Sequence, residues 1–274
     1  MIDTSNLVFC LNGTRVCREN VDPTMLLIDY LRLPEVGLTG TKLVCGEGGC
    51  GACTVMMAHK DRRTGQVVER PVNACLRPLC TVDGTMITTT EGLGSIKTGH
   101  LNPIQEKIAD GNGSQCGYCT PGWVMTMYGL LRNNRRPTSQ EVEDYFSGNL
   151  CRCTGYRSIL NAMQSFVDDV ALQDQAAGES IDPNAFPESR RLYFRGSGYE
   201  FYRPLELREV LELLQRYHAT PSTVKLVNGN TSIAIYKREV YDPKVLIDIS
   251  QVVELTELSG LRVHERQRVV AAAG

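Results

Sequence analysis

Residues 45–53 read CGEGGCGAC, three cysteines in a C-x4-C-x2-C spacing with four glycines packed between them. A fourth cysteine follows at Cys75. This is the plant-type spacing for a [2Fe–2S] cluster, whose thiolate ligands need a backbone that wraps closely around the inorganic core. Glycine allows such a path because it lacks a Cβ and adopts positive φ readily. The candidate ligands of a first cluster are therefore Cys45, Cys50, Cys53 and Cys75.

A second cysteine set has the form C-x2-C…C-x-C and consists of Cys116, Cys119, Cys151 and Cys153. Its first pair lies just ahead of residues 120–122, TPG, where threonine is a favoured N-cap and proline suits the first helical position. Helix N-termini favour anionic groups such as thiolates. We therefore predict a second [2Fe–2S] cluster, held between the ends of helical segments.

Two other uses of these cysteines stay open. A disulfide framework needs an oxidising compartment, and residues 1–4, MIDT, do not look like a secretion signal, so we expect a reducing, cytoplasmic location. Structural zinc also uses C-x2-C, but zinc sites rarely need four glycines between their ligands. Outside both sets, Cys80 is the alternative to Cys75, and we expect Cys10 and Cys17 to be small buried hydrophobes on strands.

Composition excludes some partners. The chain has 274 residues, 29 basic and 31 acidic, for a net charge of −2, with no basic block. We therefore expect neither nucleic acid nor a membrane as a partner. The histidines His59, His100, His218 and His264 show no paired metal spacing.

Local patterns predict a change of architecture along the chain. Leu7, Phe9 and Leu11 alternate before Asn12-Gly13, which is a strong hairpin signal. From about residue 100 the apolar period becomes helical, with a capping box at residues 138–141. Other expected elements are a helix at 24–31, strands at 52–58 and 86–90, and helices opening at Asn102, at Thr120 and before Ile159.

The C-terminal third begins with irregular sequence. Residues 171–198 lose periodicity and predict a linker. An amphipathic helix carrying Val210, Leu211 and Leu214 and a strand at 224–227 then precede the turn at 228–232, NGNTS. Such a turn is either a pyrophosphate cradle rich in N–H donors or an ordinary loop.

Three segments resemble the signatures of the molybdenum hydroxylases, the family of xanthine dehydrogenase and aldehyde oxidase. They are CGEGGCGACTV at 45–55, QCGYCTPG at 115–122 and GNLCRCTGY at 148–156. Colinear similarity covers residues 5 to about 170 and, more faintly, 199 to 260. The resemblance implies an α+β chain: a β-grasp, ferredoxin-like 2Fe-2S domain at 5–92, a four-helix 2Fe-2S domain at 93–170, a linker at 171–198 and a partial PCMH-type FAD-binding domain at 199–274.

The resemblance also implies an activity. In this family a molybdenum–pterin centre hydroxylates a purine or an aldehyde, and electrons then pass through two [2Fe–2S] clusters to FAD. The Cys116 set would lie nearer the molybdenum and the Cys45 set nearer the flavin, while Gln115 and Cys153 would approach the molybdopterin. FAD contacts would come from Leu226, Val227, Asn228, Gly229, Asn230, Thr231, Ser232 and Ile233.

The substrate site is not expected in this chain, so no catalytic residue is assigned. The expected partners are a molybdopterin-binding domain or subunit, the remainder of the FAD domain and, in the full oxidoreductase, a second copy. Because the sequence stops at Gly274, we expect a fragment, a truncated gene model or a small subunit. The alternatives are a stand-alone ferredoxin-like carrier and a zinc scaffold.

Overall fold

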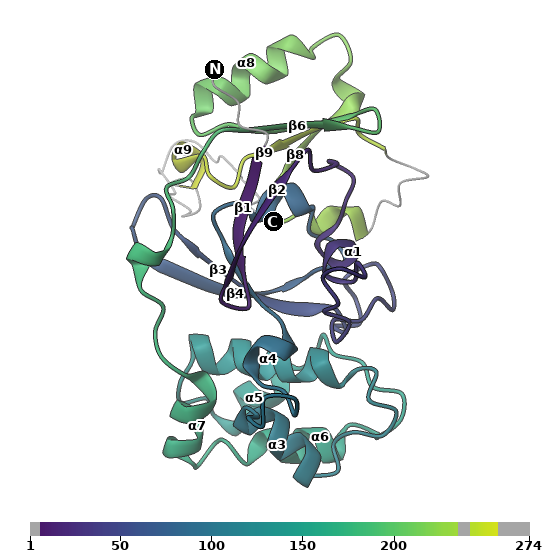
Figure 1. Ribbon diagram of the computed structural model, residues 1–274, viewed down its shortest axis with the longest axis vertical. Coiled ribbons are helices and arrows are strands. Elements are labelled where there is room, and N and C mark those ends of the chain that lie inside the picture. Colours follow the sequence, from purple (N-terminus) through teal and green to yellow (C-terminus); the bar gives the residue numbers. More distant parts are fainter. Residues whose placement is uncertain (1–5, 235–241, 257–274) are drawn as a thin grey trace, which may run out of the picture.

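Three tiers of structure lie along the long axis of the molecule (Figure 1). The computed structural model describes residues 6–234 and 242–256. A five-stranded sheet forms the middle tier, a group of helices forms the lower tier, and a four-stranded sheet covered by a helix forms the upper tier. The chain is therefore a mixed α+β protein whose N-terminal part lies between the other two.

The middle tier begins with the predicted hairpin. β1 (Asn6–Leu11) and β2 (Thr14–Glu19) pair antiparallel around Asn12 and Gly13, which have φ of 48° and 82°. The strand order is β2-β1-β5-β3-β4, with β5 parallel to β1 and antiparallel to β3. The remaining elements of this tier are the helix α1 (Leu27–Leu31), the strands β3 (Thr54–Lys60), β4 (Val67–Asn73) and β5 (Met86–Thr88), and the 3-10 turn η1 (Leu79–Val82).

The lower tier confirms two of the predicted helix starts. Asn102 caps the first long helix, and Thr138 and Glu141 form the predicted capping box. The helix that carries residues 120–122 has Cys119 as its N-cap, one residue earlier than predicted. The helices are α2 (Thr90–Leu93), α3 (Pro103–Asp110), α4 (Thr120–Asn133), α5 (Ser139–Tyr145), α6 (Arg157–Gln164) and α7 (Val170–Ala177).

Helix α4 joins the lower tier to the middle one. Its residue Gly129 lies against Pro71 of β4, where an added Cβ would come within 3.1 Å of the proline ring. Arg132 of α4 forms a largely buried ion pair with Glu69 of β4 and also donates to the carbonyl of Ala177. On its other side α4 places Trp123 in the helical core, stacked on Phe146 at 4.7 Å.

The upper tier shares its core with the middle tier. Phe194 and Phe201 belong to the same buried cluster as Phe9 and Leu27. The sheet order is β6-β7-β9-β8. Its elements are β6 (Leu192–Gly196), β7 (Tyr199–Arg203), α8 (Leu207–Arg216), β8 (Val224–Val227), the 3-10 turn η4 (Thr231–Ala234), β9 (Val245–Asp248) and α9 (Val253–Thr256).

A buried arginine secures this junction. Arg203 of β7 is 2 % exposed and lies 3.0 Å from the carboxylate of Asp248. Its guanidinium also lies 3.7 Å from the carboxylate of Asp83 and donates to the carbonyl of Thr81 at 2.7 Å. Residues 79–83 are thereby tied to the upper sheet.

Several local predictions were wrong. The expected linker at 171–198 contains most of α7 and all of β6, because Ala176 and Ala177 pack into the helical core and the Asn102 side chain donates to the carbonyl of Ala176. Leu211 and Cys17 are exposed rather than buried. The helix expected at 24–31 begins only at Leu27, and the strands expected at 52–58 and 86–90 span 54–60 and 86–88.

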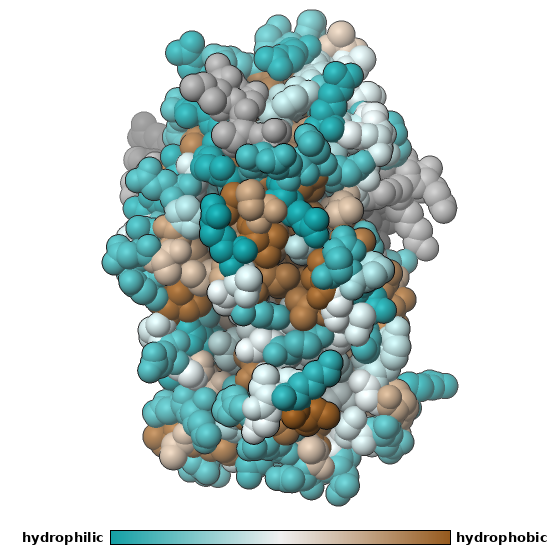
Figure 2. Space-filling view, viewed as in Figure 1, coloured by the Kyte–Doolittle hydropathy of each residue, from teal (hydrophilic) through white to brown (hydrophobic). Residues whose placement is uncertain are grey.

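The molecular surface is mixed in polarity. Apolar residues gather near the middle of the face in Figure 2, over β1 and β2, and polar residues cover most of the remaining surface. Among the described helices, none is long and apolar enough to cross a membrane. Residues 257–274 of the predicted flavin segment, with His264, lie outside the described residues.

Candidate metal centres

Strand pairing assembles the first four-cysteine site. Cys45, Cys50 and Cys53 lie on the loop between α1 and β3, and Cys75 follows β4. Because β3 and β4 pair in the register Thr54↔Asn73, Cys53 is placed beside the Cys75 segment, and the amide of Ala74 donates to the Cys53 carbonyl at 3.2 Å. Two distant parts of the chain thus supply one ligand set.

The four thiols of the first site form two hydrogen-bonded pairs. Burial opposes ionisation of Cys45, but amide donors from residues 47, 49 and 50 and the thiol of Cys50 outweigh it and lower its pKa. In the other pair, the hydrogen bond from Cys53 lowers the pKa of Cys75 to about 7, and Cys53 has a raised pKa. Amide donors aimed at sulfur stabilise thiolates, the form that binds metal.

Two glycines of the CGEGGCGAC loop are required by close contacts. Gly48 has φ of 72°, and a Cβ there would lie 2.5 Å from Leu76. Gly51 has φ of 70°, and a Cβ there would lie 2.6 Å from the side chain of Asn149 and 2.9 Å from a carbonyl of the second ligand loop. The glycine-rich sequence therefore serves both the wrapping of the loop and its contact with the neighbouring site.

The second site joins a helix start to a loop. Cys116 and Cys119 precede α4, and Cys151 and Cys153 lie on the loop between α5 and α6. Side-chain hydrogen bonds again join the thiols in pairs, Cys116 with Cys153 and Cys119 with Cys151. Thr154 lies beside Cys151, its hydroxyl 3.1 Å from the sulfur.

Electrostatics within the second site follow the same pattern as in the first. Burial opposes ionisation of Cys151, but Thr154 and neighbouring amides outweigh it and lower its pKa. Burial raises the pKa of Cys119 to about 12.

All eleven cysteines have free thiols. Within residues 6–234 and 242–256, no three His, Cys, Asp or Glu side chains converge on one point as ligands of a single ion would.

The two sites touch through their ligand loops. The amide of Leu150, next to Cys151, donates to the carbonyl of Cys50 at 3.1 Å. Beside it, α4 approaches so closely that a Cβ on Gly122 would lie 2.2 Å from the carbonyl oxygen of Gly51. One backbone hydrogen bond therefore connects a cysteine of the first site with the residue before a cysteine of the second.

The remaining residues singled out from the sequence lie at the surface of the second site or in the sheet and core of the middle tier. Gln115 and Cys153 are exposed, at the surface of the second site. Cys80 is fully buried, and burial raises its pKa well above the usual range, as expected of a core thiol. Cys10 is partly buried on β1.

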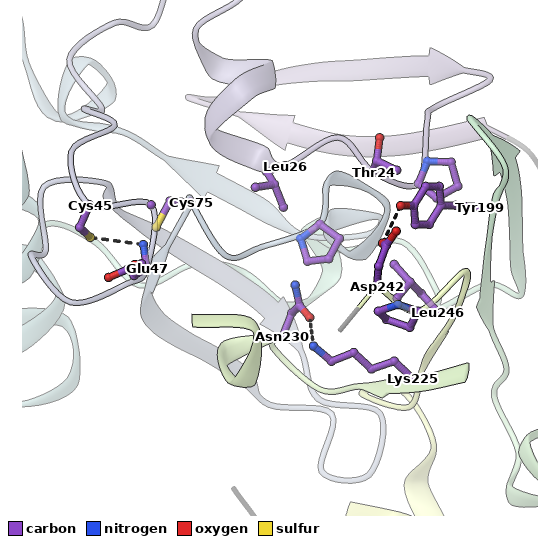
Figure 3. A pocket seen from close by; sticks show the side chains of 14 residues that line it. Thr24, Leu26, Cys45, Glu47, Cys75, Tyr199, Lys225, Asn230, Asp242 and Leu246 are labelled. Atoms are coloured by element: carbon purple, nitrogen blue, oxygen red, sulfur yellow. Dashed lines mark hydrogen bonds between the residues drawn. The ribbon is translucent and has the colours of Figure 1, made fainter. Parts of the chain in front are cut away.

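A cavity of about 310 Å³ lies between the first site and the upper tier (Figure 3). Cys45, Glu47 and Cys75 line one side, and Tyr199 and Asp242 lie on another. The segment predicted to contact FAD contributes Asn230 to the lining.

The predicted FAD contacts do not all face this cavity. Leu226 is exposed on β8, and Val227 is buried. Asn228, Thr231 and Ser232 are exposed, and the side chain of Ile233 lies outside the described residues. Lys225, which directly precedes the residues predicted to contact FAD, also lines the cavity.

Comparisons with known proteins agree on the cysteine-bearing regions. Residues 9–80 match the family model described as a 2Fe-2S iron-sulfur cluster binding domain, and residues 89–164 match that of a [2Fe-2S] binding domain. The xanthine dehydrogenase/oxidase of Felis catus is 55% identical over 84% of this chain and 20% of its own length. Aldehyde oxidase 1 of Cavia porcellus is 52% identical over 60% of this chain and 12% of its own length.

Solved structures include a similar chain that is covered almost completely. The quinoline 2-oxidoreductase of Pseudomonas putida 86 is 36% identical with a TM-score of 0.51, over 62% of this chain and 94% of that one. The aldehyde oxidoreductase of Desulfovibrio gigas is 37% identical with a TM-score of 0.50, over 60% of this chain and 17% of that one. The chain spans about a fifth of the length of the first curated relatives it matches.

Proposed function

Because the chain belongs to the molybdenum hydroxylase family of xanthine dehydrogenase and aldehyde oxidase, we propose that it is the electron-transfer portion of such an oxidoreductase. It would accept electrons from a molybdopterin centre at the second cysteine site and deliver them to FAD at the first. When bound, the two [2Fe–2S] clusters supply one-electron transfer. The purine or aldehyde substrate would be bound elsewhere in the enzyme.

The contact between the two ligand loops carries this proposal. Through the hydrogen bond from Leu150 to the Cys50 carbonyl and the approach of Gly122 to Gly51, the two ligand loops are in direct backbone contact. Such an arrangement keeps two redox centres at a fixed, short separation within one chain. A protein with two independent metal sites would not need it.

The pairing of the thiols supports dinuclear clusters rather than zinc. Four sulfurs arranged as two pairs suit a core with two irons, each bound by two cysteines. A structural zinc ion instead needs four ligands around one point. In this assignment the first cluster is held by Cys45, Cys50, Cys53 and Cys75, and the second by Cys116, Cys119, Cys151 and Cys153.

The three tiers correspond to three proposed units. We assign residues 5–92 to a β-grasp ferredoxin-like domain, 93–170 to the helical cluster domain and 199–274 to part of a PCMH-type FAD-binding domain. The mixed five-stranded sheet with α1 on one face supports the first assignment. The stretch 171–198 serves as the connection, although α7 packs with the helical unit.

The molybdopterin-binding partner, a domain or a subunit, would dock at the second site. Gln115 and Cys153 are accessible there, and the apolar residues Tyr118, Leu150 and Tyr156 are exposed beside the cysteines. Exposed apolar side chains around a redox site suit a contact with another protein surface. The proposal also includes the remainder of the FAD domain, a second copy of the enzyme and a cytoplasmic, reducing compartment.

Metal analysis of the purified chain tests the assignment. We expect about four iron and four sulfide per chain and two distinguishable EPR signals after reduction. Cys119→Ser should remove only the second signal, whereas Cys80→Ser, at a buried cysteine outside both sites, should keep both. Zinc in place of iron would overturn the proposal.

A stand-alone carrier is the second candidate. It is favoured by the quinoline 2-oxidoreductase chain, because 94% of that chain is covered by this one. A chain that loads both clusters, binds no flavin and exchanges electrons with an external molybdenum subunit would support this alternative. Tight flavin binding would instead favour the first.

A further inference from the structure

The side chain of Asn149 lies at the boundary between the two cysteine sites. Asn149 comes two residues before Cys151 on the second ligand loop and is only 5% exposed. Its amide packs against Gly51, where an added Cβ would lie 2.6 Å from Nδ2. Gly51 in turn lies between two ligands of the first site, Cys50 and Cys53. A side chain from the second ligand loop therefore reaches the backbone of the first.

Backbone hydrogen bonds hold this side chain in place. The N–H of Asn149 donates to the carbonyl of Phe146 at 2.9 Å. The next amide along the chain, that of Leu150, donates to the carbonyl of Cys50 at 3.1 Å. Because both neighbours of the Asn149 side chain are tied down, the amide cannot leave the first ligand loop without breaking the contact between the two sites.

A second asparagine at the first site shows the pattern expected of a structural amide. Asn73, the last residue of β4, lies beside Gly48, and its Nδ2 donates to the Gly48 carbonyl at 3.1 Å. Its Oδ1 accepts from the thiol of Cys53 at 3.7 Å. By contrast, the side-chain amide of Asn149 makes no hydrogen bond to any residue that the structure describes. Asn149 therefore keeps two N–H donors that packing alone does not require.

An unpaired amide is an expensive choice for so enclosed a position. A buried donor without an acceptor costs about 1–3 kcal/mol, and leucine would fill a similar volume without that loss. The ligand sulfurs of Cys50 and Cys53 flank the glycine on which the amide packs, and sulfur is an acceptor that becomes more negative on reduction. Hydrogen bonds to the sulfurs are one of the factors that set the reduction potential of a [2Fe–2S] cluster.

We propose that Asn149 donates an amide N–H to a sulfur of the first cluster and thereby raises the reduction potential of that cluster. The inference rests on the two clusters of the proposed function and adds to the first site a residue carried by the second ligand loop. Such a bond stabilises the reduced state more than the oxidised state, because the reduced state carries more negative charge. It therefore favours electron transfer from the second cluster to the first, the direction given in the proposed function.

An EPR-monitored redox titration of the loaded chain tests this role. At a fixed solution potential, Asn149→Leu should lower the ratio of reduced to oxidised first cluster at least about threefold, because it removes the donors and keeps the volume. Asn149→Asp, which replaces the donors with a negative charge, should lower that ratio further. The ratio for the second cluster should stay unchanged in both variants. Asn161→Leu, at an exposed asparagine of α6 in the same tier, is the matched control.

A nitrogen label identifies the hydrogen bond itself. In a loaded chain whose asparagines carry nitrogen-15 only at the side-chain amide, pulsed EPR of the reduced first cluster should detect a coupled label that disappears in Asn149→Leu. The label on Asn73 remains in that variant and is the internal reference. A residue that only packs between the loops would change neither the coupling nor the potential.

The outcomes separate this inference from the proposed function. An unchanged first-cluster ratio in both variants, a shift confined to the second cluster, or a label coupling that persists in Asn149→Leu would overturn the inference. None of these results would touch electron transfer, provided that iron, sulfide and both EPR signals match those of the unaltered chain. Should Asn149→Leu lose its iron, Asn149→Asp, which keeps the size and polarity and also lacks the labelled amide, decides by the same two measurements.

Discussion

Replacing Arg203 with methionine should loosen the upper tier from the cluster-bearing sheet. Methionine keeps much of the volume but removes a guanidinium that serves two carboxylates and the carbonyls of residues 80, 81 and 83. Asp83 would keep Arg190 and the amide of Val8 as partners. Asp248, only 1% exposed, would keep a backbone donor from Ser250 and the nearby charge of Arg77 but lose its ion-pair partner.

The expected loss of stability follows from the broken ion pair of that buried carboxylate. Removing one partner of a buried ion pair costs about 3–5 kcal/mol, a large part of the roughly 5–15 kcal/mol that holds a typical domain together. Urea unfolding followed by far-UV circular dichroism should therefore show a much lower midpoint. Visible absorbance, recorded in parallel, should report loss of the first cluster in the same transition because the two tiers share one core.

A second substitution checks the reasoning. Asp248→Asn in the Arg203→Met background removes the stranded charge and keeps an acceptor for the Ser250 amide, so it should restore about 1–3 kcal/mol. A loss below about 1 kcal/mol in the single variant, or no recovery in the double variant, would refute the assigned role of this arginine.

Three further outcomes follow from the structure. Gly122→Ala places a Cβ 2.2 Å from a backbone oxygen and should destabilise the chain by about 1–3 kcal/mol in urea unfolding, whereas Gly148→Ala, with open space around it, should not. Trp123, the single tryptophan, is buried in the core that contains Cys151, so its fluorescence should be quenched in the loaded chain and recover in Cys151→Ser but not in Cys75→Ser. Burial and nearby arginines lower the pKa of His59 below its usual 6.5, so the unfolded chain binds more protons than the folded chain. In acid titrations of unfolding, the contribution of His59 to stability should be complete above that pH and fall below it, by at most about 1.4 kcal/mol per pH unit. His59→Leu should flatten that slope.

Local chemistry made much of the fold predictable. The Asn12-Gly13 turn and the Thr138–Glu141 capping box are decided by neighbours in sequence, and both predictions were confirmed. By contrast, β4 was missed because VVERPVN carries charge and a proline within the strand. The helix α7 was missed because alanines pack without giving a strong apolar period.

The same distinction between local and long-range features applies to the candidate metal sites. Cysteine spacing predicted which thiols belong together, because ligand sets leave a local pattern. Their division into pairs and the contact of Leu150 with Cys50 depend on strand register and helix packing, which spacing does not encode. Phe194 and Phe201 likewise enter a core built from residues far earlier in the chain.

The unequal exposure of the two cysteine sites bears on the durability of the protein. At the first site Cys50, Cys53 and Cys75 are buried, whereas at the second Cys116 and Cys153 are exposed. Air and chelators should therefore dismantle the second centre first, and the iron content of a stored sample should pause at about half its initial value. A partner that covers the second site would protect this centre from air and chelators as well as supply its electrons.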